Sequence, residues 1–328
     1  METIGKNKNI VIMVTGGTIL CSYDASRHES IPNVPVDDIS DFVSPHKRGY
    51  GVVVKEFSNI PSPHLSLELG EKLLKEASEI LSREDTAGLV VVQGTDTLEE
   101  IAYLFYLVLD TDKPVVFTGS MKSRDELYSD YKGNIDGAVK IIESGKAAGR
   151  GVMVYLNQEI HSARYVSKDN TNNIAAFKSP QFGPIGVLYD NEVAFLGKTE
   201  AEAHFSPVKL DNNVQLIRVT YSTNELLLRS CINEGVPGVV IEGFGAGNVP
   251  PSLIPAIKDA ISAGIPVVLT SRCHTGHVVE TYSYEGGGAE LRKLGVINGG
   301  NLGGIKARIR LIVLLGMQLG IDFVKENF

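Results

Sequence analysis

Uninterrupted apolar runs alternate along the chain with amphipathic stretches that have helical spacing. The segment Ile12–Ile19, IMVTGGTI, is an apolar run that ends in two glycines and a threonine. The segment Ala87–Glu100 repeats this plan, because its apolar run ends at a glycine and TDT opens a helical pattern. Such runs are typical of central parallel strands, which helices cover on both faces. The pattern therefore predicts parallel strands that end in tight loops.

The same alternation continues through both halves of the chain. Further strands are predicted at residues 52–57, 114–118, 151–156, 214–219, 239–241 and 265–270, and helices at 36–42, 67–83, 98–109, 133–145, 224–233, 253–263 and from 306 onward. Strands that alternate with helices predict an α/β fold with a mostly parallel sheet in each half. Ligands of such folds bind outside the carboxyl ends of the strands.

Two stretches interrupt the alternation. Residues 20–35 are polar and contain two prolines, so we expect a loop, and loops of this length are often lids or binding loops. Residues 191–213 are charged and lack periodicity, which is typical of a connection between domains. We therefore expect an N-terminal catalytic domain at 1–195, a linker at 196–213 and a C-terminal domain at 214–328.

Composition narrows the class of protein. The chain has 328 residues, 43% of them hydrophobic, and a formal net charge of −8, so it can form sizeable cores but lacks the basic surface that nucleic acid requires. Its apolar runs are too short for a signal-peptide core or a bilayer span. The three cysteines, Cys21, Cys231 and Cys273, have no metal or redox spacing. We expect a cytoplasmic protein with reduced thiols, in which Cys21 acts as a small hydrophobe.

The polar residues that follow the two glycine-ended runs are candidates for chemistry. Thr18 would lie at the mouth of the sheet, although it could instead cap the next segment. Asp96 or Thr97 could likewise be a helix cap, because Glu99 and Glu100 follow in the first helical turn. Neither motif alone shows whether its threonine or aspartate takes part in a reaction or only caps a helix.

Taken together, the two motifs resemble a known pair. TGGTI at 15–19 and GTDT at 94–97, followed by two glutamates, resemble the signature motifs of the bacterial-type L-asparaginase/glutaminase family, asparaginase I/II type. The resemblance continues in order through Asp112–Val116, Gly119–Met121, Arg164–Thr171, Ala176–Ser179, Gly183–Pro184 and Gly245–Asn248. These matches cover nearly the whole chain.

The resemblance implies both an architecture and a reaction. It implies two three-layer α/β domains, a larger N-terminal one with a flavodoxin-like, mostly parallel sheet and a smaller Rossmann-like C-terminal one. It also implies a homotetramer built as a dimer of intimate dimers. The implied activity is hydrolysis of L-asparagine to L-aspartate and ammonia through a threonine acyl-enzyme, with neither a metal nor a cofactor.

Amide hydrolysis by a covalent route needs a nucleophile and a group that takes its proton. A threonine hydroxyl is a poor nucleophile at neutral pH, so a basic partner must lie beside it. Lys168 lies in a polar stretch, and a desolvated lysine held by Asp96 could take a proton from a nearby hydroxyl. By resemblance, Thr18 is the acyl-forming nucleophile, and Thr95, Asp96 and Lys168 form the supporting triad.

The resemblance also assigns substrate contacts. It places Ser62 against the α-carboxylate of a free amino acid and Asp96 against its α-amino group, and a carboxylate is the expected partner of an ammonium. Asn248 matches an asparagine that the family brings to the active site of a neighbouring subunit. The substrate-binding residues expected in all are Gly17, Ser62, Gly94, Thr95, Asp96, Ser120 and Asn248.

Several positions depart from the family pattern. Gln93 stands where a histidine usually precedes GTDT, and Pro63 stands where a glutamine commonly follows the match of Ser62. The segment 128–134 is also rewritten. The lid tyrosine cannot be placed by spacing, and Tyr23 is nominated as the one tyrosine in the 20–35 loop. Glu280 and Glu285 are the candidates for its acidic partner from another subunit.

Other classes of protein remain as alternatives. A dinucleotide site at Gly243–Gly247 lacks the third glycine at the fingerprint spacing, and a metal site at His274 and His277 lacks further ligands nearby. An amino-acid-binding module on the same scaffold would have no need for a desolvated base such as Lys168. A related amidohydrolase acting on glutamine, a D-amino acid or another small amide also stays open.

Overall fold

The chain divides into two compact units, Met1–His204 and Phe205–Phe328, in a computed structural model. The structure describes residues 8–32, 35–39, 43, 49–197 and 203–328. The division between the units lies inside the linker expected at 196–213. The two domain boundaries at 195 and 214 remain predictions.

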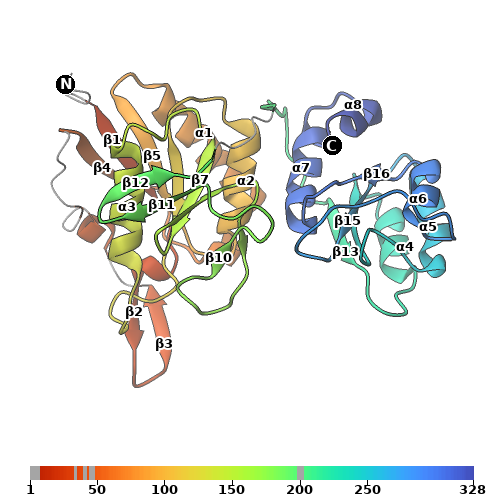
Figure 1. The fold of residues 1–328 in the computed structure, drawn as a ribbon, viewed down its shortest axis with the longest axis horizontal. Helices are drawn as coiled ribbons and strands as arrows, with labels where there is room; N and C mark the ends of the chain where they lie inside the picture. The colour runs from red at the N-terminus through yellow and green to blue at the C-terminus, as the bar shows by residue number, and fades with distance from the viewer. Residues whose placement is uncertain (1–7, 33–34, 40–42, 44–48, 198–202) are drawn as a thin grey trace. The chain divides into compact units, whose positions relative to one another are not determined.

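The first unit is built on an eight-stranded sheet with the order β12-β11-β8-β7-β6-β5-β1-β4 (Figure 1). Its strands are β1 (Asn9–Val14), β4 (Gly51–Glu56), β5 (Thr86–Val92), β6 (Val115–Thr118), β7 (Val152–Leu156), β8 (Glu159–Ser162), β11 (Gly186–Tyr189) and β12 (Glu192–Phe195). Each pair from β4 to β7 is parallel, and each pair from β7 to β12 is antiparallel. The sheet is therefore mixed, with its parallel part in the positions that the apolar runs predicted.

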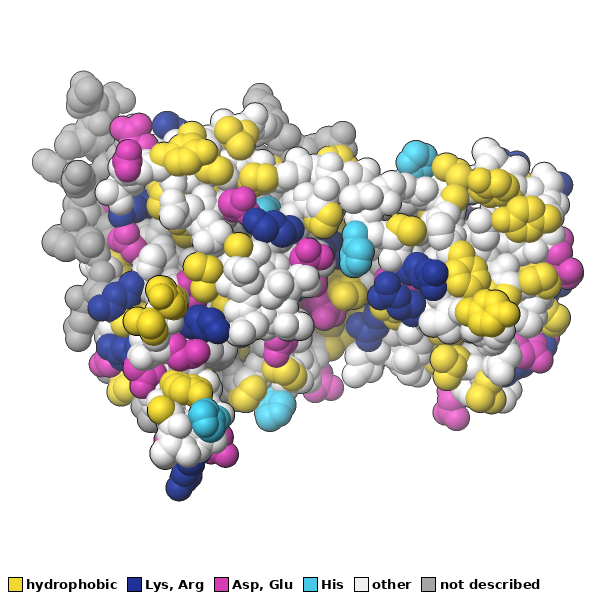
Figure 2. Space-filling model, turned by 60° about the horizontal axis from the view of Figure 1, so that its bottom comes forward, with side chains coloured by type: hydrophobic (Ala, Val, Ile, Leu, Met, Phe, Trp, Pro, Cys, Tyr) yellow, Lys and Arg dark blue, Asp and Glu magenta, His cyan; other side chains and the backbone are white. Residues whose placement is uncertain are grey.

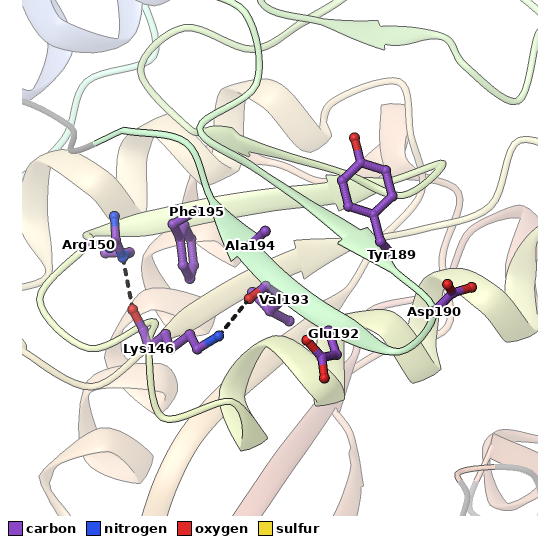
Figure 3. Close-up of a pocket in the computed structure, with 8 residues that line it drawn as sticks. All are labelled: Lys146, Arg150, Tyr189, Asp190, Glu192, Val193, Ala194 and Phe195. Atoms are coloured by element: carbon purple, nitrogen blue, oxygen red, sulfur yellow. Dashed lines mark hydrogen bonds between the residues drawn. The ribbon is translucent and has the colours of Figure 1, made fainter.

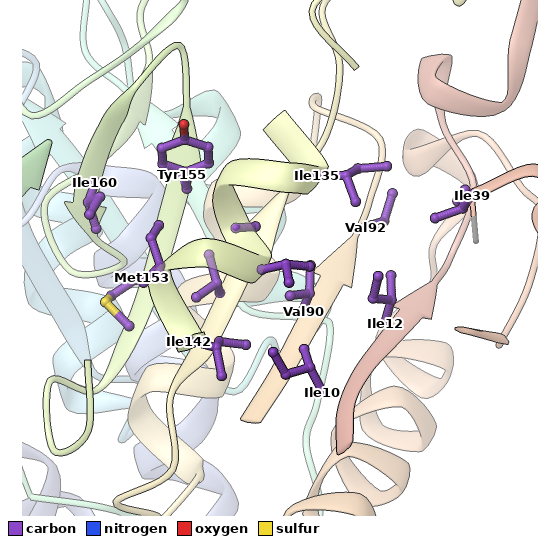
Figure 4. Close-up of a cluster of buried hydrophobic side chains, with 14 of the residues drawn as sticks. Ile10, Ile12, Ile39, Val90, Val92, Ile135, Ile142, Met153, Tyr155 and Ile160 are labelled. Atoms are coloured by element: carbon purple, nitrogen blue, oxygen red, sulfur yellow. The ribbon is translucent and has the colours of Figure 1, made fainter. Parts of the chain in front are cut away.

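Helices cover both faces of this sheet, as the uninterrupted apolar strands require. On one face, α3 (Tyr131–Glu143) packs its buried residues against alternate side chains of β1, β5 and β7, such as Ile12 and Val90 (Figure 4). On the other face, α1 (Leu67–Ser82) lies beside α2 (Leu98–Val108), whose Phe105 packs edge-on against Phe117. The first unit thus has the three layers expected from its sequence.

The second unit repeats this plan on a smaller scale. Its sheet is parallel, with the order β13 (Gln215–Arg218), β14 (Val239–Gly243), β15 (Val267–Ser271) and β16 (Ile297–Asn298). Helices α4 (Leu226–Asn233) and α5 (Ile254–Ser262) share one core with β13, β14 and β15, and α7 (Gly304–Gly316) contacts the same three strands. The shorter helices are α6 (Gly288–Leu294) and α8 (Ile321–Glu326).

The expectation of a plain loop at 20–35 is wrong. A hairpin of β2 (Cys21–Asp24) and β3 (Glu29–Pro32) occupies it and projects from the first unit (Figure 1). The Asp24 carboxylate accepts hydrogen bonds from Ser26 N, Ser26 Oγ and Arg27 N, which closes the turn. Such short strands carry no apolar alternation, so the sequence pattern could not reveal them. Residues 33–34 lie outside the described residues.

Other short elements were also missed. The helix expected at 36–42 is a 3₁₀ turn, η2 (Val36–Ile39), and residues 40–42 are outside the described part of the chain. Strand β8 lies in the polar stretch before Lys168, where the sequence predicts no strand, and β12 lies within 191–213, where the sequence predicts a connection between domains. Four-residue strands of mixed polarity have too few positions to show the apolar–polar alternation that indicates a strand.

Acidic and basic side chains are interspersed on the face of the molecule shown in Figure 2. This distribution agrees with the acidic net charge of −8 and offers no continuous basic surface on that face. Within the described ranges, no helix has both the length and the apolar composition needed to cross a bilayer.

Candidate active site

Four loops with polar residues leave the carboxyl ends of adjacent parallel strands. Because the sheet order contains β4, β1, β5 and β6 side by side, the loops that carry Ser62, Thr18, Thr95 and Ser120 meet at one edge of the sheet. This is the edge at which α/β sheets bind ligands. The topology therefore gathers residues that lie about a hundred positions apart in the sequence.

Two glycines allow these loops to touch. Gly17 has φ +97°, and a Cβ on it would lie 2.3 Å from the Gly94 Cα. A Cβ on Gly94 would in turn lie 2.8 Å from the Ser62 Oγ. No side chain fits at either position, so the glycines let the two backbones and the Ser62 side chain approach one another directly. The predicted substrate residues Gly17, Ser62 and Gly94 therefore lie in contact.

Thr18 stands at the rim of this contact and is half-buried. It begins the 3₁₀ turn η1 (Thr18–Leu20), whose other two residues are buried and anchor the turn in the core. The preceding loop is held to the neighbouring strand, because Thr15 Oγ1 donates to the Val92 carbonyl at 3.2 Å. Ser58 Oγ donates to the Thr15 carbonyl at 2.8 Å from the other side. Thr18 thus sits on a firmly held backbone.

Lys168, Thr95 and Asp96 form a hydrogen-bonded cluster. Lys168 Nζ lies 2.9 Å from Thr95 Oγ1 and 2.6 Å from Asp96 Oδ1. The Lys168 side chain is 16% exposed, whereas that of Asp96 is 61% exposed. The buried Glu99 accepts a hydrogen bond from the Lys168 backbone N–H at 3.4 Å. The structure brings the expected triad together, and its chemical role remains a prediction.

A second hydrogen-bond chain runs behind Ser62, which is buried. Gln93 Nε2 donates to Thr97 Oγ1 at 3.1 Å, and Thr97 Oγ1 donates to the Ser62 carbonyl at 3.2 Å. Gln93 Oε1 is buried and has no hydrogen-bond partner among the described residues. Gln93, noted in the sequence only as a departure from the family pattern, therefore supports the loop that carries Ser62.

Ser120 is buried and directed at a carboxylate. Its Oγ donates to Asp130 Oδ1 at 2.7 Å, and the backbone N–H groups of Met121 and Lys122 reach the same carboxylate at 3.1 Å. Asn134 Nδ2 donates to its other oxygen at 2.9 Å. Sequence reasoning missed Asp130, whose segment was noted only as rewritten. The hydroxyl of Ser120 stabilises this turn, and a substrate contact by Ser120 stays a prediction.

Tyr23 lies on β2, and its hydroxyl forms a hydrogen bond with His28 Nδ1 at 3.1 Å. Among the described residues, this hydroxyl forms no hydrogen bond with Thr18. Its backbone N–H donates to Asp125 Oδ1 at 2.6 Å, and Ser30 Oγ lies 2.7 Å from Ser123 Oγ. The hairpin is therefore tied to the loop that follows β6. The role of lid tyrosine stays a prediction for Tyr23.

Cys21, close to Thr18 in the sequence, is not prepared for nucleophilic chemistry. Burial raises the pKa of the Cys21 thiol above its ordinary value. Its Sγ lies 3.6 Å from the Gly17 carbonyl, to which it donates. A protonated, half-buried thiol packs as a small hydrophobe, as the sequence analysis expects.

Asn248 belongs to the second unit, in the glycine loop after β14. Phe244 and Asn248 form an isolated bridge, and the buried Asn248 Oδ1 has no hydrogen-bond partner among the described residues. Of the two expected acidic partners, Glu280 accepts a hydrogen bond from Asn298 Nδ2 at 3.1 Å, while Glu285 is exposed.

The open cavity drawn in Figure 3 lies elsewhere in the first unit. It measures about 730 Å³ and lies along β12, at the far end of the sheet order from β4 and β1. Lys146 Nζ donates to the Val193 carbonyl at 3.0 Å, and the Arg150 guanidinium stacks 3.8 Å from the Phe195 ring centroid. Its cationic side chains are thus engaged with the edge strand and do not face the predicted catalytic residues.

His274 and His277, the histidines considered as metal ligands, are both exposed. Within the described residues, no group of three or more His, Cys, Asp or Glu side chains is arranged to hold a metal ion.

Comparisons with known proteins agree with the motifs. The family model "Asparaginase, N-terminal" matches residues 9–201, and "Glutaminase/Asparaginase C-terminal domain" matches residues 213–328. An L-asparaginase of Bacillus licheniformis is 31% identical, with 98% of this chain and 99% of that protein covered. L-asparaginase 2 of Escherichia coli is 29% identical, with 98% and 92% covered.

A solved structure is also similar to this chain over nearly its whole length. The crystal structure of a probable cytoplasmic L-asparaginase from Campylobacter jejuni matches with a TM-score of 0.85 and 28% identity, and 98% of each chain is covered. The similarity thus includes both units and every strand of the candidate site. The chain belongs to the asparaginase family.

Proposed function

We propose that this protein is an L-asparaginase, which hydrolyses L-asparagine to L-aspartate and ammonia. Full-length similarity to proteins named L-asparaginases supports the reaction. The observation that carries the proposal is the hydrogen-bonded cluster of Lys168, Thr95 and Asp96 beside the loop of Thr18. A pure binding module has no use for a lysine amine held against a hydroxyl at the mouth of the sheet.

In the first half of the proposed reaction, the Thr18 Oγ attacks the side-chain amide carbon of asparagine. The carbon–nitrogen bond breaks, the proton of the Thr18 hydroxyl passes to the departing nitrogen, and ammonia leaves. The product is an aspartyl ester of Thr18. Backbone N–H groups of the glycine loops are the natural donors to the oxyanion, because no side chain separates them from the substrate.

In the second half, water attacks the ester carbon and releases aspartate and the free Thr18 hydroxyl. Thr95 Oγ1, 2.9 Å from Lys168 Nζ, relays a proton of the attacking water to Lys168 Nζ as the base, and this proton is returned to the departing Thr18 Oγ. Asp96 holds the lysine at 2.6 Å and so fixes the direction of its Nζ. Lys168 and Asp96 act together with Thr95 as one unit.

The substrate is proposed to bind by its charged α-groups. The exposed Asp96 carboxylate takes the α-ammonium, and Ser62, in contact with Gly94, takes the α-carboxylate. The direct contact of Gly17 with Gly94 holds the two substrate-binding loops side by side. These contacts favour a free amino acid over a peptide.

The proposed assembly is a homotetramer, a dimer of intimate dimers, in the cytoplasm. The unpaired Asn248 Oδ1 supports a role for the second unit in the active site of a neighbouring subunit. The related Campylobacter jejuni protein is described as cytoplasmic. Light scattering of the purified protein tests the assembly, since a monomer would contradict it.

The test of function is ammonia release from a panel of amides. L-Asn, L-Gln, D-Asn and β-aspartyl amides are supplied to the wild-type protein, and aspartate or glutamate is measured alongside ammonia. We expect the highest kcat/KM on L-Asn. A higher kcat/KM on another amide would show that the protein is a related amidohydrolase with a different substrate. Binding of L-Asn without turnover of any amide would show that it is a binding module and not an enzyme.

A further inference from the structure

Lys168 lies on a ribbon that is too short to hold itself. The ribbon consists of β9 (Ser167–Lys168) and β10 (Phe177–Lys178), with Lys168 opposite Phe177. One more backbone hydrogen bond, from Asp169 N to the Ala176 carbonyl at 2.8 Å, extends it. Two-stranded ribbons of this size are not stable alone in water, so neighbouring structure must fix the place of Lys168.

Four side chains connect this ribbon to strand β8 of the main sheet. His161 Nδ1 lies 3.0 Å from Ser179 Oγ, directly after β10. Lys178 Nζ lies 2.7 Å from Glu159 Oε2, and the His161 Nε2 lies 3.5 Å from the same oxygen. Glu159 and His161 come from β8, and Lys178 and Ser179 come from the end of the ribbon. We call these four residues the clasp.

The clasp has the polar atoms of a hydrolytic triad but not its geometry. In a serine triad, the histidine presents Nε2 to the serine and Nδ1 to the acid, whereas here His161 presents Nδ1 to Ser179 and Nε2 to Glu159. His161 is 1% exposed and Ser179 is 5% exposed, so no substrate reaches the serine. The clasp is therefore not a second catalytic centre.

A buried hydrogen bond of this kind is costly to break, because the atoms left behind have no water to replace their partner. The His161–Ser179 bond thus fixes the ribbon against β8, and the ion pair of Glu159 and Lys178 acts in the same direction nearer the surface. At the other end of the ribbon, the Lys168 backbone N–H is held by Glu99 of α2. The ribbon is anchored on both sides.

We infer that His161 and Ser179 are positioning residues for Lys168. By joining β10 to β8, they keep Lys168 Nζ at 2.9 Å from Thr95 Oγ1 and 2.6 Å from Asp96 Oδ1. This inference rests on the proposed function, in which Lys168 takes part in the reaction. A shift of the ribbon would leave the substrate-binding residues Ser62 and Asp96 in place, because these follow β4 and β5.

The test combines kinetics with hydrogen–deuterium exchange of the 163–179 segment. Ser179→Ala and His161→Leu remove the bond, whereas His161→Asn keeps a polar group near the Nδ1 position and is the matched control. We expect Ser179→Ala and His161→Leu to lower kcat on L-Asn by about 10- to 100-fold, with KM changed less than about threefold. Exchange in the segment rises in both variants, and His161→Asn restores most of kcat and protection.

A double-mutant cycle separates positioning from general damage to the fold. In a Lys168→Met background, Ser179→Ala is expected to lower the residual kcat no further, because the group it positions is gone. An equal loss in both backgrounds, or unchanged kcat and exchange in Ser179→Ala, would overturn the inference. If the wild-type protein hydrolyses no amide, the proposed function fails, while exchange in Ser179→Ala still decides whether the clasp holds the ribbon.

Discussion

Two glycine loops follow central parallel strands, one in each unit, and they differ in what surrounds them. After β1, a Cβ on Gly17 would lie 2.3 Å from the Gly94 backbone. After β14, Gly245 has φ +43°, yet a Cβ there would meet nothing within 4 Å. The first loop packs directly against a neighbouring backbone, whereas the second is open at Gly245 and meets only the Val278 and Leu269 side chains at Gly247.

The difference extends to the polar groups. The glycine loop of the first unit lies beside the loop of Thr95 and Asp96, both of which are hydrogen-bonded to Lys168, so the first unit contains most of the groups of the proposed reaction. The glycine loop of the second unit ends at Asn248, whose Oδ1 is buried and has no hydrogen-bond partner among the described residues. Under the proposed function, the first unit carries the reaction and the second unit supplies one contact. The following experiments test this division.

Thr18→Ala should have the largest effect, because it removes the proposed nucleophile from the locked loop. We expect kcat on L-Asn to fall by about 10⁵-fold while the melting temperature stays close to that of the wild-type protein. Thr18→Ser is the control, since it keeps a hydroxyl. If Thr18→Ala retained more than a few per cent of kcat, the first loop would not carry the reacting group.

Lys168→Met should come next, with a loss of kcat of about 10³-fold. The methionine keeps the length of the side chain but removes the Nζ that contacts Thr95 and Asp96. Because these three act as a unit, Thr95→Val should add little in the Lys168→Met background. Fully additive losses in steady-state kinetics would show that the lysine and the threonine act independently.

Gly17→Ala compared with Gly245→Ala measures the locking directly. We expect Gly17→Ala to lower the free energy of unfolding by about 3 kcal/mol or more, since its Cβ would overlap the Gly94 backbone. Gly245→Ala should cost only about 1 kcal/mol, the strain of a left-handed residue in open space. Urea unfolding of both variants provides the values, and equal losses would remove the distinction between the two loops.

Asn248→Ala should have a smaller effect on activity. If its side chain contributes one hydrogen bond to a neighbouring active site, kcat/KM should fall by about tenfold. The stability of the second unit should not decrease, because Asn248 Oδ1 gives up no partner within the described chain. An unchanged kcat/KM in the assembled enzyme would leave the second unit without a part in the reaction.

Cys21→Ala should have the smallest effect, with kcat within about threefold of the wild-type value. Burial raises the pKa of the Cys21 thiol, so its thiolate fraction is low at neutral pH and grows only as the pH rises above the ordinary thiol range. Iodoacetamide should therefore label Cys21 more slowly at neutral pH than the exposed Cys273. Rapid loss of activity on labelling of Cys21 would contradict its structural role.

The sequence predicted the strands that are uninterrupted apolar runs and the helices that have apolar residues at helical spacing. The strands that contain Ile12 and Val90 were found because each is buried on both faces, and their order along the sheet then places Thr18 beside Thr95. The cluster with Lys168 came from motif resemblance, because no period indicates which loop lysine faces a threonine. Its distances could not be predicted from the sequence.

The remaining parts depend on contacts between distant polar residues. Ser30 and Ser123 are 93 positions apart, and no local pattern reveals that they join the hairpin to the loop after β6. Likewise, His161 lies in a short strand and Ser179 lies directly after one, and neither strand shows an apolar alternation, so the sequence pattern reveals neither β8 nor the clasp. Long-range hydrogen bonds decide these elements, and they become visible only when the fold is known.

The most direct test of the account is to locate the acyl group. The enzyme is mixed with excess L-Asn, quenched in acid within the first turnover and digested, and the peptides are analysed by mass spectrometry. The account predicts that the peptide containing Thr18 carries the mass of one aspartyl group, and that this adduct is absent in Thr18→Ala. An aspartyl adduct on the peptide containing Thr95, or adduct-free peptides during turnover, would contradict it.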